Sequence, residues 1–380
     1  MGTQIKVIGV GEGGGNAVEH MISQGVTGVQ FIYADTDSQA LLHSNAEIQI
    51  QLGASGLGAL GKPDAGRAVA EGTKEQIRAA LDGAHMVFIA AGIGGGTGTG
   101  AAPVIARIAK EMGILTVGVV TRPFEFEGGR RMYQADVGLK ELEANVDSLV
   151  VVLNEKVLEL LGDNVTQREA FSMANDILKN TVDGICHILH IPGLVNVDFD
   201  DIKTVMREPG RAMVGTAVAN GLDRATKAAE AAVACPLLEG FALSSARGVL
   251  VLIAAGKSKF KLSESRTVMN TIRQYAAEEA HVIYGTAYDE SLGDQLRVTV
   301  IATGLGGAEL ARAPIAAMHR APLTQAFART GTDNIPVLNF RNSLSVWRNG
   351  PNQATSKANS LSSNGMDDIE IPAFLRRQPE

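Results

Sequence analysis

The sequence predicts an α/β fold in which a parallel sheet, covered by helices on both faces, is followed by a smaller domain with a mixed sheet. In the first half of the 380 residues, short continuous apolar runs alternate with amphipathic stretches. This pattern is typical of a parallel sheet that is buried on both faces. One long helical pattern at residues 168–189 then separates this half from a region of longer apolar runs.

Each predicted element follows from one of these patterns. In the first half we expect strands at residues 5–11, 30–34, 85–91, 115–121 and 148–153, and helices at 67–81, 101–112 and 131–146. The long helix at 168–189 has the length of a connector between domains and is stopped by Ile191-Pro192-Gly193. Beyond it, strands at 248–255 and 297–303 and a helix at 263–280 indicate the smaller mixed-sheet domain.

Composition limits the class of function. A net charge of −7 without a basic stripe argues against a protein that binds nucleic acid along its length. The chain starts its first strand without a signal-peptide pattern and has no apolar run of about 20 residues, so we expect a cytoplasmic protein with no membrane span. Cys186 and Cys235 have no Cys-x-x-Cys companion and are interpreted as free thiols, and His187 and His190 as packing or surface residues.

A first glycine-rich segment, GVGEGGGN at residues 9–16, lies between the first strand and a helix. Glycines let the backbone approach phosphate oxygens, and a helix N-terminus offers unpaired N–H groups and a partial positive charge. Gly9, Gly11 and Gly14 also match G-x-G-x-x-G, and Asp35 follows about 20 residues later at the end of the second strand. This segment alone leaves an NAD-dependent Rossmann dehydrogenase open, as well as a structural turn.

A second glycine-rich segment, GGGTGTG at residues 94–100, follows the strand at 85–91. It provides consecutive N–H donors and two hydroxyl groups, but lacks the Gly-Lys-Ser/Thr of a Walker loop. Phosphates bound here would depend on backbone dipoles and on a magnesium ion. A dinucleotide-binding fold has no need of this segment, so the two together predict a nucleotide held by its phosphates on two loops.

A pair of acidic residues, Asp198 and Asp201, lies three residues apart at a predicted helix start, so that the two carboxylates can share one side of the first turn. One interpretation is structural, with Asp198 as the N-cap and Asp201 as an acidic residue that suits the helix dipole. The other is functional, with two carboxylates that orient and polarise a water beside a cation. The local pattern leaves both open.

Four strings occur in this order: GVGEGGGNAVEHM, GGGTGTGAAPVIA, RPFEFEGGRRM and PGLVNVDFDDIKTVM. Together they closely resemble the FtsZ family, the bacterial tubulin-like cell-division GTPases. The resemblance runs from about residue 5 to residue 304 and returns at DIEIPAFLRRQ, residues 368–378. It implies a tubulin-like fold and a GTP-hydrolysing cytoskeletal protein that polymerises head-to-tail into the filaments of the division (Z) ring.

The resemblance also implies roles for individual residues. GTP or GDP, with magnesium, would be held through its phosphates by Gly11, Glu12, Gly13, Gly14, Gly15 and Asn16, and by Gly94, Gly95, Gly96, Thr97, Gly98, Thr99 and Gly100. Glu127 and Arg131 match positions near the ribose and phosphates, and Asn154 and Asp176 match positions at the ribose and the guanine. Asn196, Asp198 and Asp201 match the family's synergy loop, whose acids reach the γ-phosphate bound to the neighbouring subunit. The active site would therefore be completed only by head-to-tail assembly.

Three residues depart from the family's usual pattern: Glu12 and Leu60 stand where glycine is common, and Asp35 stands where asparagine is usual. A carboxylate at Glu12 would repel phosphates unless it points to solvent or meets a cation, and Asp35 adds a second negative charge. Two alternatives follow from these departures. One is a specialised or weakly hydrolysing paralogue that co-assembles with a standard copy, and the other is a nucleotide-binding structural subunit with negligible turnover.

The expected domain organisation has five parts: a GTP-binding domain at residues 1–167, a central helix at 168–191, an assembly domain that activates GTP hydrolysis at 192–310, a flexible linker at 311–366 and a partner-binding peptide at 367–380. The linker is expected from its Ser- and Asn-rich composition. In the peptide, Ile371, Phe374 and Leu375 would share one face of a short helix. The resemblance implies FtsA and ZipA-like membrane tethers as its partners, and a location at mid-cell.

Overall fold

The computed structural model describes residues 3–305 apart from residues 57, 60, 163–164, 191–196 and 235–242. One sheet of ten strands runs through this part of the chain, in the order β3-β2-β1-β4-β5-β6-β7-β10-β8-β9. No helix in the described ranges is long and apolar enough to cross a membrane. The expected linker and C-terminal peptide, Cys235 and the side chains of His187 and His190 lie outside the described residues.

The first six strands are all parallel, as predicted. They are β1 Ile5–Val10, β2 Val29–Asp35, β3 Ile48–Gln51, β4 Met86–Gly92, β5 Leu115–Arg122 and β6 Ser148–Leu153. Their order, β3-β2-β1-β4-β5-β6, is also that of dinucleotide-binding sheets. Topology therefore does not separate the two nucleotide hypotheses, but it does locate a site. In such sheets ligands bind beyond the carboxyl ends of the strands where the strand order reverses, here beside β1 and β4.

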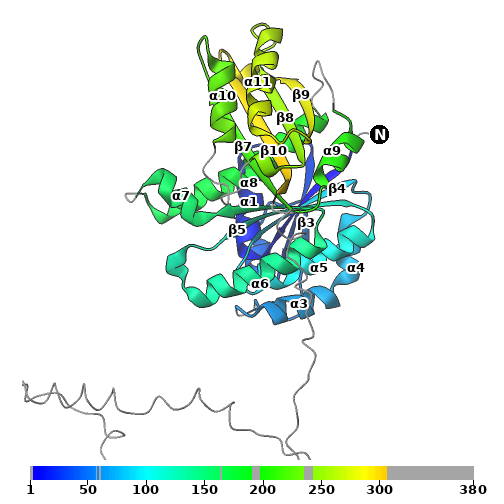
Figure 1. Ribbon diagram of the computed structural model, residues 1–380. Helices are drawn as coiled ribbons and strands as arrows, with labels where there is room; N and C mark the ends of the chain where they lie inside the picture. Colours follow the sequence, from blue (N-terminus) through cyan, green and yellow to red (C-terminus); the bar gives the residue numbers. More distant parts are fainter. Residues whose placement is uncertain are drawn as a thin grey trace, which may run out of the picture. The chain divides into compact units, whose positions relative to one another are not determined.

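Helices cover both faces of these strands, as Figure 1 shows. On one face lie α3 Pro63–Gly72, α4 Lys74–Leu81, α5 Thr97–Glu111 and α6 Gly129–Asn145, which share one buried apolar cluster with the sheet. On the other face lie α1 Gly11–Ser23 and the long α8 Gln167–His190. Burial on both faces explains why β1, β4, β5 and β6 are continuous apolar runs, whereas the edge strand β3, with the sequence IQIQ, alternates.

The last four strands form the mixed part of the sheet, which confirms the predicted fold class. They are β7 Arg211–Ala219, β8 Gly248–Ala255, β9 His281–Tyr288 and β10 Leu296–Leu305. Strand β10 is antiparallel to β7 and β8, whereas β8 and β9 are parallel. Helices α10 Arg224–Val233 and α11 Leu262–Tyr275 cover one face of these strands. The other face packs on α8, which is therefore shared by the cores of both halves.

Some predicted elements differ from the structure for local reasons. The helix predicted at residues 67–81 is two helices, because the chain bends at Thr73, whose hydroxyl donates to the Val69 carbonyl at 2.7 Å. The helix predicted at 263–280 ends at Tyr275, since Ala276 adopts an extended conformation. Three strands, β3, β7 and β9, were not predicted. Strand β3 has only four residues, and β7 carries Gly215, which lowers strand propensity.

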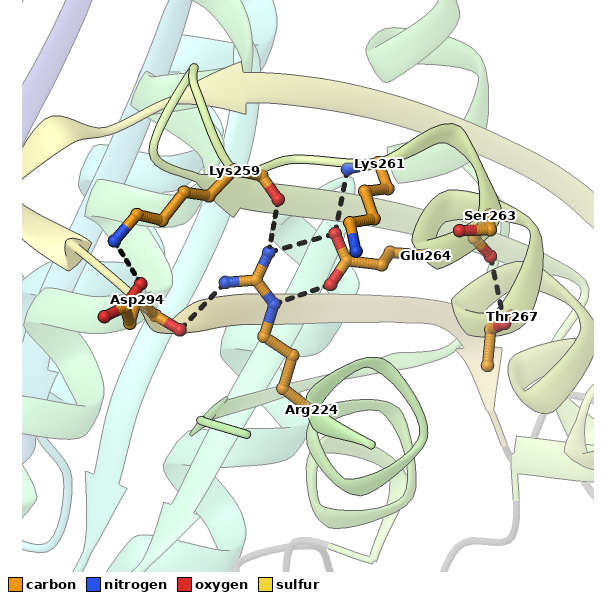
Figure 2. A network of polar contacts seen from close by, with 7 residues as sticks. All are labelled: Arg224, Lys259, Lys261, Ser263, Glu264, Thr267 and Asp294. Carbon is orange, nitrogen blue, oxygen red and sulfur yellow. Dashed lines mark hydrogen bonds and ion pairs between the residues drawn. The ribbon is translucent and has the colours of Figure 1, made fainter. Parts of the chain in front are cut away.

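A buried arginine ties together one end of the mixed sheet (Figure 2). Arg224 donates to both carboxylate oxygens of Glu264, at 2.6 and 2.9 Å, and to the backbone carbonyls of Lys259 and Asp294, both at 2.8 Å. Burial alone would raise the pKa of the Glu264 carboxyl, but the hydrogen bonds from Arg224 and the Lys261 backbone outweigh burial and lower this pKa. The pair therefore stabilises the folded state at neutral pH, and this contribution is lost as the pH falls through the lowered pKa.

Candidate functional site

Two helices begin next to each other at the carboxyl ends of neighbouring strands. Helix α1 starts at Gly11, directly after β1, and α5 starts at Thr97, shortly after β4. Neither N-cap residue, Val10 for α1 or Gly96 for α5, uses a side chain to cap its helix. The first N–H groups of both helices thus lack side-chain acceptors from their caps and carry the positive ends of two helix dipoles. This arrangement suits a polyanion such as the phosphates of a nucleotide.

Each glycine-rich segment has a position that requires glycine, and at Gly11 the first segment approaches the second. Gly11 has a φ of +69°, and a Cβ added to it would lie 2.9 Å from the Gly98 backbone nitrogen. Gly94 has a φ of +111°, and a Cβ there would lie 2.9 Å from the ring of Pro123 and 3.0 Å from the Arg131 side chain. A side chain at either position would strain the backbone; at Gly11 it would also push the two loops apart, and at Gly94 it would collide with Pro123 and Arg131.

Most of the other glycines are needed for packing within the protein rather than for ligand contact. An added Cβ would lie 2.3 Å from the Ala90 carbonyl oxygen at Gly14, 2.5 Å from the Gly92 carbonyl oxygen at Gly98, and 1.9 Å from the Pro63 carbonyl oxygen at Gly100. Glycine density is therefore a weaker indication of ligand binding than the sequence suggests.

Gly95 is the exception among the glycines of the second loop. A Cβ added to Gly95 would have no atom of the described chain within 4 Å, and its φ is not positive. Neither packing within the described chain nor backbone conformation therefore demands a glycine here. Its position in the loop that opens α5 leaves space where a phosphate group could approach the backbone.

The threonine hydroxyls of the second loop bond to other parts of the protein. The Thr97 hydroxyl lies 2.7 Å from that of Thr36, which follows β2. The buried Thr99 hydroxyl accepts a hydrogen bond from the Gly94 N–H at 2.8 Å. Both side chains thus fix the shape of the loop, and contacts to a phosphate would come mainly from its backbone N–H groups.

An ion pair lies beside the second loop. Glu127, in the short helix η1 Glu125–Glu127, accepts from the Phe124 N–H at 2.9 Å and lies 3.0 Å from Arg131, in the first turn of α6. The Arg131 side chain is 52% exposed and passes close to Gly94. Its guanidinium therefore has donors available for a phosphate or ribose oxygen.

The two residues expected at the ribose and the base have unequal surroundings. Asn154, at the start of α7 Asn154–Leu161, is 4% exposed, and no partner for its side-chain oxygen occurs in the described ranges. A buried acceptor without a donor costs about 1–3 kcal/mol, so a hydroxyl of a bound ligand is a fitting partner. Asp176, on α8, is half exposed and lies 2.7 Å from His20 on α1.

Two residues next to these positions, Phe171 and His20, were not predicted from the sequence as parts of a site. Phe171 precedes Asp176 on α8, is 40% exposed and packs edge-on against Phe124 at 5.3 Å between ring centroids. An exposed aromatic ring of this kind can stack on a nucleotide base. Its signal in the sequence was an aromatic residue within two turns of the expected base-binding aspartate. For His20, which bonds to Asp176 across 156 residues, the sequence offered no signal.

The two unusual acids of the first loop region differ in their environment. Glu12 is exposed in the first turn of α1, so its carboxylate can face solvent or a cation. Asp35 is 3% exposed and accepts hydrogen bonds from the Tyr33 hydroxyl and from the N–H groups of Thr36 and Asp37, at 2.6, 2.6 and 3.3 Å. Burial, together with this contact to Asp35, raises the pKa of Tyr33.

These donors change the expectation for Asp35. Its negative charge is stabilised within the protein, so repulsion of phosphates is weaker than the sequence suggests. In dinucleotide-binding enzymes, an acid at the end of the second strand must accept a ribose hydroxyl. A buried carboxylate that already accepts three N–H or O–H donors is poorly suited to that role. Leu60, the third unusual residue, lies outside the described residues.

The two acids expected to belong to a synergy loop, Asp198 and Asp201, lie at the other end of the sheet from the glycine loops. Asp198 is the N-cap of α9 Phe199–Met206 and accepts from the Asp201 N–H at 2.8 Å, and both side chains are exposed. The Phe199 ring packs against His85, at the amino end of β4, with 6.2 Å between centroids. The glycine loop follows the carboxyl end of the same seven-residue strand, which is roughly 20 Å away. Asn196 lies outside the described residues.

The described residues contain no cluster of three or more His, Cys, Asp or Glu side chains that could bind a metal ion by itself. Magnesium in nucleotide sites is held by one or two carboxylates together with substrate phosphates. The glycine loops fit a magnesium site of this kind, in which phosphates supply most of the ligands. Glu12, in the first loop, is an exposed carboxylate that could supply a ligand from the protein.

Comparisons with known proteins match this architecture in both halves. The family model described as "Tubulin/FtsZ family, GTPase domain" matches residues 4–162, and "FtsZ family, C-terminal domain" matches residues 210–306. The cell division protein FtsZ of Pseudomonas aeruginosa is 49% identical over 385 residues, with 99% of this chain and 97% of the relative covered. That of Coxiella burnetii is 46% identical over 391 residues, with the same coverage.

Solved structures give the same result. An FtsZ dimer from M. jannaschii aligns with a TM-score of 0.75 and 38% identity, and covers 80% of this chain and 89% of its own. CetZ1 from Haloferax volcanii aligns with a TM-score of 0.70 at 19% identity, over 80% of this chain and 94% of its own, which supports the fold alone.

Proposed function

The chain belongs to the tubulin/FtsZ family, and from that premise we propose that its GTPase site is shared between neighbouring subunits of a head-to-tail filament. It is a GTP-binding and GTP-hydrolysing protein with a tubulin-like fold. As in the relatives named for cell division, its role would be to assemble into the division ring at mid-cell.

The observation that carries this proposal is the separation of the two halves of the site. Asp198 and Asp201 lie beyond the amino end of β4, and the glycine loops lie beyond the carboxyl ends of β1 and β4. Side chains of a few ångströms cannot bridge roughly 20 Å within one subunit. A second copy that places its α9 against the loops of the first would complete the site. Such a heterologous contact does not close on itself and generates a filament.

In the completed site each part has a distinct task. Backbone N–H groups at the starts of α1 and α5 would hold the phosphates, with Arg131 beside them. Asp201 of the adjoining subunit would accept a hydrogen bond from the attacking water, and Asp198 would orient Asp201 through the helix cap. A magnesium ion would neutralise part of the phosphate charge, and Glu12 is the exposed carboxylate of the first loop that could help to hold the ion.

The first test is the dependence of GTP hydrolysis on protein concentration. We expect the rate per molecule to rise steeply above an assembly threshold, because an isolated subunit lacks the acids. Phosphate release and light scattering should be measured over the same concentration series with saturating GTP and magnesium. A rate per molecule that is constant across the threshold would contradict a shared site. Bound GTP with negligible turnover at every concentration would favour the nucleotide-binding structural subunit, the alternative that Glu12 and Asp35 motivate.

We also propose that residues 367–380 bind membrane tethers of the FtsA and ZipA type. The support is the spacing of Ile371, Phe374 and Leu375 after a polar segment, which would place the three side chains on one apolar face of a short helix in a partner's groove. A chain that ends at residue 366 should keep concentration-dependent GTP hydrolysis but no longer sediment with vesicles that carry FtsA or ZipA. Phe374→Ala in the full chain should weaken sedimentation in the same way. Failure of the truncated chain to assemble in solution would show that the peptide belongs to the filament.

A further inference from the structure

A histidine and an aspartate from distant parts of the chain meet at the expected base-binding end of the site. The Nε2 atom of His20 lies 2.7 Å from Oδ1 of Asp176. His20 is in the last turn of α1, and Asp176 is on α8, which packs beside α1 on the same face of the sheet. The His20 side chain is 16% exposed and that of Asp176 is 44% exposed.

The place of this pair suits contact with a base rather than with phosphates. His20 is nine residues beyond Gly11 in α1, which corresponds to roughly 13 Å along the helix axis. The phosphate-binding N–H groups are at the start of the helix, so Asp176 lies well away from them. An extended nucleotide, with phosphates at one end and base at the other, fits this separation.

The chemistry of the base explains why the orientation of Asp176 matters. Guanine presents two parallel donors, its N1–H and its exocyclic amine, so a carboxylate must offer one lone pair from each oxygen in the same plane. The two oxygens of a carboxylate have about four acceptor sites. Oδ1 can therefore accept from His20 and from the base together. The terminal torsion of an aspartate is broad, so a half-exposed Asp176 without a fixed neighbour would sample many orientations.

We propose that His20 is a positioning residue that gives the site its preference for guanine, by holding the Asp176 carboxylate in the plane of the base. The inference depends on the proposed function, because it takes GTP as the ligand and adds the contact between Asp176 and guanine that the family resemblance implies. His20 does not touch the nucleotide in this arrangement. Its contribution is to fix the acceptor before the base arrives, so that less rotational freedom is lost on binding.

The experiment compares two nucleotides that differ in one donor. Inosine diphosphate lacks the exocyclic amine of GDP and keeps N1–H and the phosphates, so the ratio of the two dissociation constants isolates the second hydrogen bond to Asp176. Both should be measured on nucleotide-free full-length protein, by calorimetry or by competition with a fluorescent GDP. We expect the wild-type protein to prefer GDP by roughly tenfold, the value of one hydrogen bond to a charged group.

Two substitutions of His20, to Gln and to Asn, introduce the same amide group on side chains of different length. The His20→Gln side chain carries an N–H near the position of Nε2 and should keep most of the preference for GDP. The shorter His20→Asn side chain cannot reach Asp176, so its GDP affinity should fall roughly tenfold and the ratio should approach one. The free energies of unfolding of the two nucleotide-free variants should agree, which separates positioning from a general loss of structure.

The outcomes distinguish this inference from the proposed function. If the wild-type protein binds neither nucleotide, the proposed function itself fails. If it prefers GDP and both variants keep that preference, His20 has no positioning role and the inference is overturned. Equal loss in both variants would also overturn it, since His20→Gln retains the donor. A protein with both Asp176→Ala and His20→Asn should bind GDP as weakly as Asp176→Ala alone. His20 acts only through Asp176, so its replacement costs no further affinity once Asp176 is gone.

Discussion

Asp201→Ala should abolish GTP hydrolysis and leave GTP affinity of the isolated subunit unchanged. The carboxylate is exposed in the first turn of α9, roughly 20 Å from the glycine loops of its own chain. It can therefore act only on a nucleotide bound to another copy. Removal of a group that orients and polarises the attacking water lowers turnover by about 100-fold or more. Binding should be measured below the assembly threshold and hydrolysis well above it.

The neighbouring Asp200 provides a matched control. It is also acidic and exposed in the first turn of α9, but it lies between Asp198 and Asp201, the two acids proposed to act on the neighbouring subunit, rather than at their positions. Asp200→Ala should retain hydrolysis within about twofold, since exposed substitutions away from a site have small effects. A loss of turnover in Asp200→Ala equal to that in Asp201→Ala would show that the negative charge of the turn matters, and not the placement of one carboxylate.

Mixing two inactive proteins gives a stricter test of the shared site. Asp201→Ala keeps its nucleotide loops, and a variant that cannot bind GTP keeps its Asp201. In a random one-to-one copolymer, roughly one interface in four joins intact loops to an intact Asp201. Hydrolysis should then recover to about a quarter of the wild-type rate. An equal mixture that stays inactive while both proteins are incorporated into filaments would contradict the head-to-tail site.

The sequence was sufficient for those parts of the fold that depend on local pattern. The buried strands β1, β4, β5 and β6 are continuous apolar runs between helices, and their parallel arrangement followed from that pattern. Strand β7 was missed because Gly215 interrupts a weak strand signal, and its pairing with β10 depends on residues more than 70 positions away. Tertiary contacts, rather than propensity, determine such a strand.

The candidate site could be predicted in outline because glycine loops and acidic helix starts are local features. What the sequence could not give were the partners of each group. Asp35 has the position of a ribose-binding acid in a dinucleotide fold, yet it is surrounded by donors from Tyr33, Thr36 and Asp37. Its negative charge is thus better compensated by neighbouring donors than its sequence position suggests. Similarly, Asp198 is a helix cap in the structure, and this does not prevent Asp201 from acting across an interface.

An added methyl group should lower a different property at each of two glycines of the second loop: stability at Gly100 and GTP affinity at Gly95. At Gly100 the new Cβ would lie 1.9 Å from the Pro63 carbonyl oxygen and 2.7 Å from the Arg67 backbone nitrogen, where α3 crosses α5. These are backbone atoms, so the helices must move apart. Gly100→Ala should lower the free energy of unfolding by about 1–3 kcal/mol or more, as overpacking of a core does. Urea unfolding of the nucleotide-free protein would measure this loss.

At Gly95 the same methyl group meets no atom of the described chain within 4 Å and needs no unusual backbone conformation. Gly95→Ala should therefore change the free energy of unfolding by less than about 0.5 kcal/mol. Its GTP affinity should nevertheless fall roughly 10- to 100-fold, because the methyl group occupies space that a phosphate needs to reach the backbone N–H groups. If Gly95→Ala binds GTP as the wild type does, the open space at this position is not where the phosphates lie, and the second loop must bind them elsewhere along α5.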